Sequence, residues 1–219
     1  KSGNACQKQG GGGGGGVGFL PDTTVRKAAE RGSVPAELSD GHSKYIRTLD
    51  SDARSDLKDY TLGGDERLNS ALRDNPDPEA LVHHERKLFE SIDTAIADAP
   101  PLAKPVTTYR GIKLSVGEGD QLFEEVSNGV GGTMNLPGIV STSLDPRTAT
   151  EFSNDIVFEI KTNRGLYVSS ISQAGGESEM MLRHNQEYKI IGAKRGVKFD
   201  TAKGVSGMRV IQLEQIDAE

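Results

Sequence analysis

Two glutamates separated by a single residue give the first chemical signal in this chain. Glu177 and Glu179 follow the pair Gly175-Gly176 and precede an apolar run that begins at Met180. In a β-strand, residues i and i+2 point to the same face, so these carboxylates would project together from the start of a strand. Two like charges held so close repel each other, so a fold that keeps them together is expected to use them in its function. Taken alone, a solvated strand edge is the simpler interpretation.

An arginine upstream could bind a phosphate. Arg110 ends the β-branched run at residues 106–110, and Gly111 follows it directly. A guanidinium can donate two hydrogen bonds to one phosphate. A glycine lets a ligand approach the backbone closely. An ordinary salt bridge on an edge strand is the simpler explanation of this arginine on its own.

A run of hydroxyl side chains is the third candidate. Ser141-Thr142-Ser143 lies on an apolar segment, residues 139–143. The hydroxyls of Ser141 and Ser143 would face one side of a strand. Small donors on a buried strand suit the orientation of a carboxylate or a ribose. A strand rich in Ser and Thr with satisfied side chains remains the alternative.

Other common catalytic and metal-binding motifs are incomplete in this sequence. The His83-His84-Glu85 run does not make a zinc-binding His-Glu-x-x-His pattern, because Leu88 stands four residues after its second histidine. Ser141 lacks the glycine-flanked turn of a hydrolase nucleophile. Cys6 is the single cysteine, which excludes an internal disulfide and a cysteine-based metal site. We therefore expect no metal ion.

Composition limits the classes of partner. The 219 residues carry a net charge of −6, which argues against the phosphate backbone of a nucleic acid as the main ligand. No segment approaches the ~20 apolar residues of a membrane-spanning helix, so we expect no membrane span. The chain starts at Lys1 rather than Met, and we expect a monomeric domain of a longer polypeptide.

The first half of the sequence has helical periodicity. Residues 1–18, with seven consecutive glycines, are expected to form a flexible linker. Residues 19–219 then form the folded domain, and its helical part covers about 19–101. Caps, prolines and apolar spacing predict five helices. They are residues 22–30, one from Pro35, 51–60, 65–73, and a long one capped by Asp77.

The second half, about residues 105–215, has strand periodicity separated by Gly, Asn, Asp and Pro. Helices first and strands afterwards indicate an α+β domain and argue against a Rossmann fold. Two short helices are predicted at residues 120–127 and 146–153. The predicted strands are residues 106–110, 139–143, 156–160, 166–169, 179–182, 187–193 and 209–213.

The order of these three motifs resembles that in the mono-ADP-ribosyltransferases of the arginine-serine-glutamate class. The motifs are Arg110, then Ser141-Thr142-Ser143, then Glu177-Ser178-Glu179. This family includes bacterial actin-modifying toxins and related bacterial and phage enzymes. The resemblance covers about residues 50–215. It implies N-terminal helices followed by a core of two packed, mainly antiparallel β-sheets.

The resemblance extends beyond the three central motifs. Tyr60-Thr61, Asn69 and Leu72-Arg73 look like the helices that precede the catalytic core of the family. Phe152, eleven residues after Ser141, matches the aromatic residue that the family places beside nicotinamide.

The resemblance implies that the domain binds NAD, cleaves the bond between nicotinamide and ribose, and transfers ADP-ribose to an arginine of a target protein. Arg110 would hold a phosphate of NAD. Ser141 would orient Glu179, whose carboxylate would grip a ribose hydroxyl and stabilise oxocarbenium-like charge. Glu177 would position the acceptor guanidinium. No metal is expected to take part, because nicotinamide is already a good leaving group.

The remaining NAD contacts implied by position are Gly111, Thr142, Ser143, Phe152, Tyr60, Asn69 and Arg73. An NAD glycohydrolase that uses water as acceptor, and a catalytically silent protein-binding module of the same fold, are the alternatives. By resemblance, we expect a bacterial toxin or effector, or a phage-borne enzyme, that is secreted or delivered into the cytoplasm of a target cell.

Overall fold

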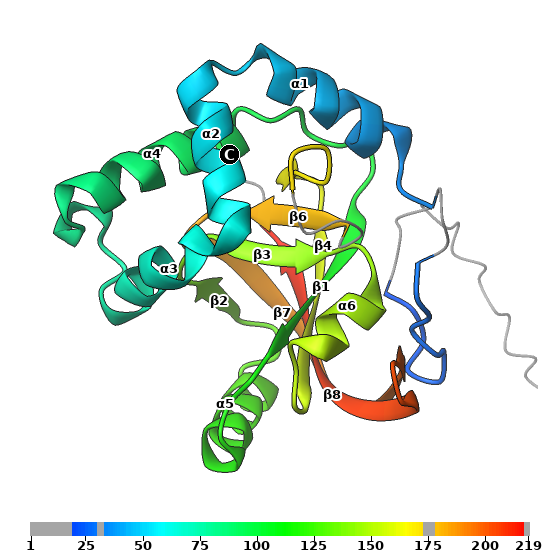
Figure 1. Ribbon diagram of the computed structural model, residues 1–219. Coiled ribbons are helices and arrows are strands. Elements are labelled where there is room, and N and C mark those ends of the chain that lie inside the picture. The colour runs from blue at the N-terminus through cyan, green and yellow to red at the C-terminus, as the bar shows by residue number, and fades with distance from the viewer. Residues whose placement is uncertain (1–18, 30–32, 173–177, 217–219) are drawn as a thin grey trace, which may run out of the picture.

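The computed structural model describes residues 19–29, 33–172 and 178–216, in which a group of helices precedes a β-sheet (Figure 1). The helices α1 to α4 lie together on one side of the sheet, and α5 (Val116–Asn128) lies away from them (Figure 1). The helical elements before the sheet are η1 (Glu37–His42), α1 (Ser43–Thr48), α2 (Ser51–Asp59), η2 (Tyr60–Gly64), α3 (Asp65–Asp74), η3 (Pro78–Ala80) and α4 (His83–Ala97).

These short helices are stabilised by one another. The Asp50 side chain caps α2 by accepting a hydrogen bond from the Ala53 N–H at 2.8 Å. Gly63, with φ of 106°, turns the chain between α2 and α3. Isolated helices of this length are marginal in water. Their apolar faces instead form a shared cluster that includes Leu57, Leu72 and Ile92.

Two helix predictions need correction. No helix occupies the described part of residues 22–30; Arg26 instead pairs with Phe199, and its N–H donates to the Lys198 carbonyl at 2.8 Å. Backbone pairing with a strand therefore overrides the local capping signal. Asp77 does act as a cap, but of the 3₁₀ turn η3, and the long helix α4 begins only at His83.

All seven predicted strands are present, and they pair in a sheet with one strand that the sequence did not reveal. The strands are β1 (Val106–Ile112), β2 (Thr133–Leu136), β3 (Val140–Ser143), β4 (Ile156–Thr162), β5 (Leu166–Tyr167), β6 (Glu179–Leu182), β7 (Gln186–Thr201) and β8 (Gly204–Gln215). β2 has only four residues, so the alternation of polar and apolar residues in Thr133-Met134-Asn135-Leu136 is a weak signal that the sequence-based prediction missed. The two predicted short helices are α5 (Val116–Asn128) and α6 (Pro146–Glu151).

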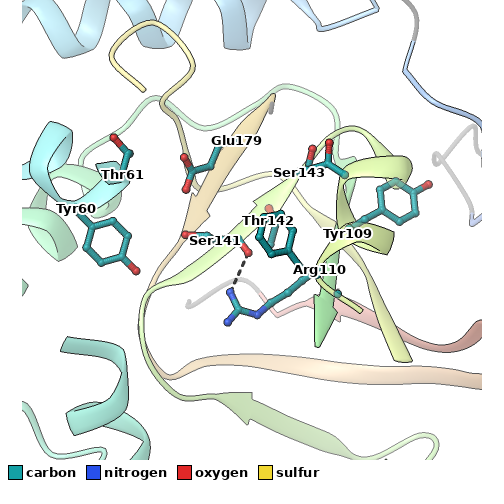
Figure 2. A pocket seen from close by; sticks show the side chains of 12 residues that line it. Tyr60, Thr61, Tyr109, Arg110, Ser141, Thr142, Ser143 and Glu179 are labelled. Atoms are coloured by element: carbon teal, nitrogen blue, oxygen red, sulfur yellow. Dashed lines mark hydrogen bonds between the residues drawn. The ribbon is translucent and has the colours of Figure 1, made fainter. Parts of the chain in front are cut away.

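Within the described part of the chain, the strands form one eight-stranded sheet in the order β2-β7-β8-β4-β1-β3-β6-β5, rather than two separate sheets. The pairs are antiparallel except for β4 with β8. β1 and β3 meet through a single residue pair, Tyr109 with Ser143. At this junction the Arg110 Nη1 donates to the Ser141 carbonyl at 2.9 Å (Figure 2). The junction divides the sheet into a long half, β2-β7-β8-β4-β1, and a short half, β3-β6-β5.

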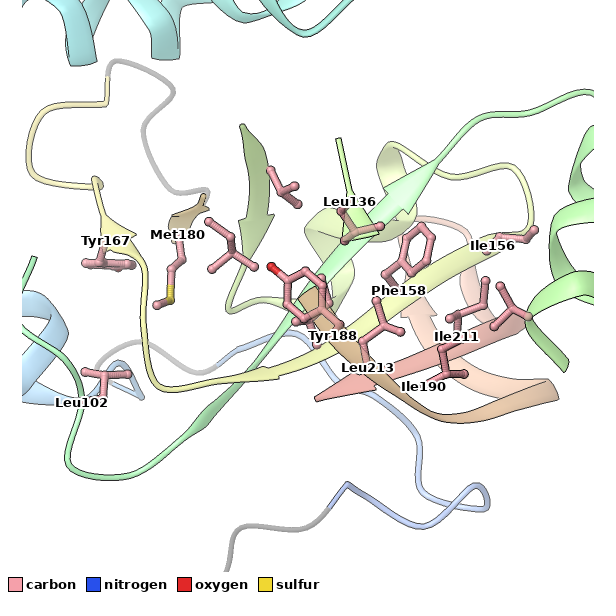
Figure 3. Packing of buried hydrophobic residues seen from close by; sticks show 14 of the residues in the cluster. Leu102, Leu136, Ile156, Phe158, Tyr167, Met180, Tyr188, Ile190, Ile211 and Leu213 are labelled. Atoms are coloured by element: carbon pink, nitrogen blue, oxygen red, sulfur yellow. The ribbon is translucent and has the colours of Figure 1, made fainter. Parts of the chain in front are cut away.

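The two halves pack against each other, as the prediction of two packed sheets requires. One buried cluster contains Phe158 and Leu213 from the long half with Val140, Met180 and Leu182 from the short half. Figure 3 shows residues of both halves in this cluster. Burial of a large aliphatic side chain contributes about 1.5–3 kcal/mol. The prediction of an α+β fold is confirmed. The prediction of two separate sheets is corrected, because the two halves are joined through β1 and β3.

A buried histidine joins the helical half to the sheet. The His42 side chain is 1% exposed, and its Nδ1 accepts a hydrogen bond from the Tyr167 N–H at 2.9 Å. Its Nε2 lies 2.9 Å from the Pro100 carbonyl. With Nδ1 accepting, the ring is neutral and the proton lies on Nε2, which donates to that carbonyl. Protonation of Nδ1 would therefore break the bond to β5.

We predict that His42 makes the stability of the domain fall in mild acid. Burial lowers the pKa of His42 below the ordinary value of 6.5, against an opposing effect of the bond to Pro100. Below pH 6.5 the unfolded state therefore binds more protons than the folded state, so stability is lost as the pH falls. The effect of one proton is at most about 1.4 kcal/mol per pH unit.

Urea unfolding between pH 7.5 and pH 5, at intervals of about half a pH unit, measures this dependence. The slope should be smaller in His42→Gln, which cannot take up a proton, than in the native chain. His83→Gln serves as the control, because His83 is exposed on α4. Equal slopes in the native chain and His42→Gln would contradict the prediction.

Within the residues described, no helix has the length and apolar character needed to cross a membrane.

Candidate active site

A pocket of about 240 Å³ lies where β1 and the short half of the sheet meet α6 and the start of η2. It gathers most of the residues that the sequence singled out. Eight predicted residues line it, namely Tyr60, Arg110, Gly111, Ser141, Thr142, Ser143, Phe152 and Glu179. Glu177 lies outside the described residues.

Strand pairing brings the serine run and Glu179 together. β3 and β6 are antiparallel, with Ser143 opposite Glu179 and Ser141 opposite Met181. Ser141 and Glu179 are therefore diagonal neighbours on one face of the sheet. Figure 2 shows the Glu179 side chain directed from β6 toward the space beside Tyr60, Thr61 and Ser141. Glu179 is only 9% exposed, so the pocket holds a nearly buried carboxyl group.

The three central residue types occupy three strands that are distant in sequence. Arg110 lies on β1, Ser141 on β3 and Glu179 on β6, and these strands are consecutive in the sheet. The bond from Arg110 to the Ser141 carbonyl uses one guanidinium nitrogen, Nη1. This bond fixes the arginine at the junction of the two halves. The site therefore depends on the junction at which β1 meets β3.

Gly111 has a structural reason that the sequence did not suggest. A Cβ atom at this position would lie 1.9 Å from the Ala149 carbonyl oxygen and 2.9 Å from the Phe152 backbone carbon. Glycine therefore lets α6 approach β1. That approach places Phe152, the residue after α6, at the pocket. Phe152 is 52% exposed, which leaves an aromatic surface available to a ligand.

Asn69 lies outside the pocket and forms hydrogen bonds with residues that shape it. Its side-chain N–H groups donate to the Tyr60 hydroxyl at 2.7 Å and to the Ile139 carbonyl at 3.1 Å, and its Oδ1 accepts from the Ile139 N–H at 2.8 Å. The amide thus holds Tyr60 and the residue before β3. A Cβ at Gly138, where φ is 82°, would lie 2.7 Å from Asn69 Oδ1. Asn69 is 5% exposed and does not line the pocket.

Arg73 is exposed at the end of α3 and is likewise absent from the pocket lining. The roles predicted for Asn69 and Arg73 in binding NAD stay predictions, as do those of the eight residues that line the pocket.

Four lining residues were not predicted as site residues. They are Thr61, Tyr109, Thr148 and Ala149. Thr61 directly follows Tyr60, and Tyr109 directly precedes Arg110, so adjacency to the predicted residues was the available signal. Tyr109 packs edge-to-face on Phe199, and burial, followed by the charge of Glu159, raises its pKa far above the ordinary value. Its hydroxyl therefore stays protonated at neutral pH.

Among the described residues, no three His, Cys, Asp or Glu side chains are grouped closely enough to hold a metal ion. The pocket instead combines a cation, hydroxyl donors, a carboxyl group and an exposed aromatic ring. This combination fits a ligand that carries a phosphate, ribose hydroxyls and a flat ring.

Comparison with known proteins identifies relatives across most of the chain. The model of a family described as "ADP-ribosyltransferase exoenzyme" matches residues 39–216. The NAD(+)--arginine ADP-ribosyltransferase EFV of Enterococcus faecalis is 24% identical over 168 residues, which are 71% of this chain and 32% of that protein. The chain therefore spans about a third of the length of this relative.

Solved structures share the fold. The C3 exoenzyme of Clostridium limosum has a TM-score of 0.68 and 21% identity, over 90% of this chain and 100% of that one. Exoenzyme S of Pseudomonas aeruginosa, in complex with human 14-3-3 protein beta and bound to carba-NAD, has a TM-score of 0.57 and 22% identity. That match covers 80% of this chain and 82% of the other.

Proposed function

The chain belongs to the ADP-ribosyltransferase exoenzyme family, and we propose from this that it cleaves NAD and transfers ADP-ribose to an arginine of a target protein. The observation that carries the proposal is the pocket that unites Arg110, Ser141 and Glu179 beside the exposed ring of Phe152. These residues come from three strands and the end of a helix. They are far apart in the sequence, and the fold brings them together.

The chemical groups of NAD match the residue types in the pocket. The guanidinium of Arg110 is suited to a phosphate, although one of its nitrogens already donates to the Ser141 carbonyl. The exposed face of Phe152 is suited to the nicotinamide ring. Exoenzyme S binds carba-NAD, which supports a similar substrate for this domain.

Glu179 acts on the ribose of the bound NAD. Its carboxylate accepts a hydrogen bond from a ribose hydroxyl and stabilises positive charge that develops on the ribose as the C–N bond to nicotinamide breaks. The bonding electrons leave with nicotinamide, which departs neutral. A nearly buried carboxylate is effective in this role because little water screens its charge.

The acceptor is an arginine guanidinium, which attacks the ribose carbon and loses one proton. Glu177 positions this cation, since a carboxylate can accept two of its five donors. The name of the Enterococcus faecalis relative, an arginine ADP-ribosyltransferase, supports this acceptor. Two relatives are called exoenzymes, which supports the further proposal that the domain is secreted or delivered into a target cell.

The direct test incubates the 219-residue chain with NAD labelled on the adenosine and with a panel of arginine-containing proteins. Transfer is expected as label bound to protein, together with an equal amount of released nicotinamide. Mass spectrometry then locates the modified residue. Nicotinamide release that is indifferent to added protein, with no bound label, would instead identify a glycohydrolase.

We predict that Glu177→Gln separates transfer from hydrolysis. Without the second carboxylate the acceptor guanidinium loses its anionic partner, and transfer should fall by about 10²-fold or more. Nicotinamide release to water should persist, because Glu179 remains. Glu124→Gln, an exposed carboxylate on α5, is the matched control and should change neither rate. Parallel loss of both activities in Glu177→Gln would refute the acceptor role.

A further inference from the structure

A shallow groove of about 440 Å³ lies beside α2, outside the catalytic pocket. One wall is a face of α2 and the other is the turn after β5. The residues that line the groove are Ser51, Arg54, Ser55, Lys58, Ser170 and Ile171.

The surface of α2 is divided by charge. At 100° per residue, Ser51, Arg54, Ser55 and Lys58 share one sector, which we call the basic face, and Asp52, Asp56 and Asp59 share the next. The third sector holds buried residues, among them Leu57 and Tyr60. Of the three sectors of α2, the basic face is the one that lines the groove.

The two cations of the basic face are available to a ligand. Arg54 and Lys58 are both exposed, and neither forms a side-chain ion pair or hydrogen bond with any of the residues that the structure describes. Like charges four residues apart on a helix repel each other. An anion in the groove would relieve this repulsion. Ser55 and Ser170 add hydroxyl donors, whereas the Ser51 hydroxyl donates to Asp52 Oδ1 at 3.4 Å.

Both walls of the groove lead to the catalytic pocket. α2 continues directly into Tyr60 and Thr61, which line that pocket. The opposite wall is tied to β6, because the Val168 N–H donates to the Glu179 carbonyl at 3.0 Å. The Ile171 and Ser172 N–H groups both donate to the Val168 carbonyl at 2.9 Å, which shapes the turn. Anything bound in the groove therefore lies next to the site of transfer.

We propose that this groove binds an acidic segment of the target protein and so presents a neighbouring residue of that segment to the catalytic pocket. The inference rests on the proposed function for the identity of the presented residue, an acceptor arginine. From Arg54 to Tyr60 the helix rises ~9 Å, about three residues of extended chain. The preferred acidic residue thus lies about three positions from the acceptor. Ile171 adds an apolar contact that suits a polypeptide more than an inorganic anion.

The test uses two fluorescein-labelled peptides of the same length, each with one arginine. One carries Asp and Glu three and four residues from the arginine, and the other carries Asn and Gln there. Fluorescence anisotropy measures the Kd of each peptide for the 219-residue chain, for Arg54→Ala/Lys58→Ala, and for Asp52→Ala/Asp59→Ala. The last variant is the matched control from the adjacent acidic sector of the same helix.

The native chain should bind the acidic peptide roughly five- to tenfold more tightly than the amide peptide, as two exposed charge pairs allow. Arg54→Ala/Lys58→Ala should lose this preference, and the control should keep or increase it. Equal binding of the two peptides by the native chain would overturn the proposal. So would an unchanged preference in Arg54→Ala/Lys58→Ala.

Two further measurements keep the result independent of folding defects and of catalysis. The preference of the native chain should shrink as NaCl rises from about 50 mM to about 500 mM, because salt screens exposed charges; a preference that salt does not change would also overturn the proposal. Nicotinamide release without peptide tests the proposed function separately, and Arg54→Ala/Lys58→Ala should retain it.

Discussion

Replacing Glu179 with glutamine is expected to lower both ADP-ribose transfer and nicotinamide release by about 10²- to 10³-fold. Glutamine keeps the size of the side chain but removes the negative charge that stabilises the developing positive charge on the ribose. Glu179 is 9% exposed and lies on β6 beside β3, so water is poorly placed to substitute for the carboxylate. The loss should appear in kcat more than in KM, since the interaction strengthens in the transition state.

Initial rates with labelled NAD measure this effect, and the same preparations should have the far-UV circular dichroism of the native chain. Glu124→Gln again provides the control of equal charge change at an exposed position. A Glu179→Gln enzyme within threefold of the native rate would remove Glu179 from the catalytic role. Comparison with Glu177→Gln separates the two glutamates, because that variant should retain nicotinamide release.

Replacing Arg26 with alanine is expected to destabilise the domain by about 3–5 kcal/mol. Arg26 is fully buried, and its Nε donates to Glu159 at 3.0 Å, while Glu159 is 1% exposed. The guanidinium also donates to the carbonyls of Leu20, Pro21 and Thr24. Alanine would leave the Glu159 carboxylate buried, and among the residues that the structure describes its remaining side-chain donor would be Gln212, at 3.0 Å. The cost comes from this uncompensated carboxylate.

Urea unfolding at pH 7.5 measures the change in the free energy of unfolding. Lys194→Ala is the matched control, because Lys194 forms a salt bridge with Asp22 in which both side chains are nearly half exposed. Such a pair contributes less than about 1 kcal/mol. The double variant Arg26→Met/Glu159→Gln should recover part of the lost stability, since it removes the buried charge. Similar stabilities of Arg26→Ala and Lys194→Ala would show that the buried pair contributes little.

The amino-acid sequence by itself determined the local elements. Helical spacing and caps located α2, α3 and most of α4, and strand periodicity located every strand except β2. The alternation of side chains also placed the central residues on the correct strands, with Ser141 on β3 and Glu179 on β6. These signals are short-range, because a strand or helix face repeats every two or 3.6 residues.

Only the tertiary structure decided how these strands meet. No local pattern specifies that β1 pairs with β3 through one residue, or that β4 and β8 run parallel, because strand order and register arise from contacts distant in sequence. The same holds for Arg26. The sequence predicted a helix there, but Arg26 pairs with Phe199 and is buried against Glu159.

The candidate site shows the same division. Its residue types and their order were readable along the chain, and the pocket unites eight of the predicted residues. The tertiary structure explains the rest. The close approach of α6 to β1 requires a glycine at Gly111 and leaves Phe152 exposed, and the approach of α3 to β3 lets Asn69 hold the residue before β3. Periodicity along one chain records which face a residue occupies, whereas the distance between two faces is set by packing of segments far apart in sequence.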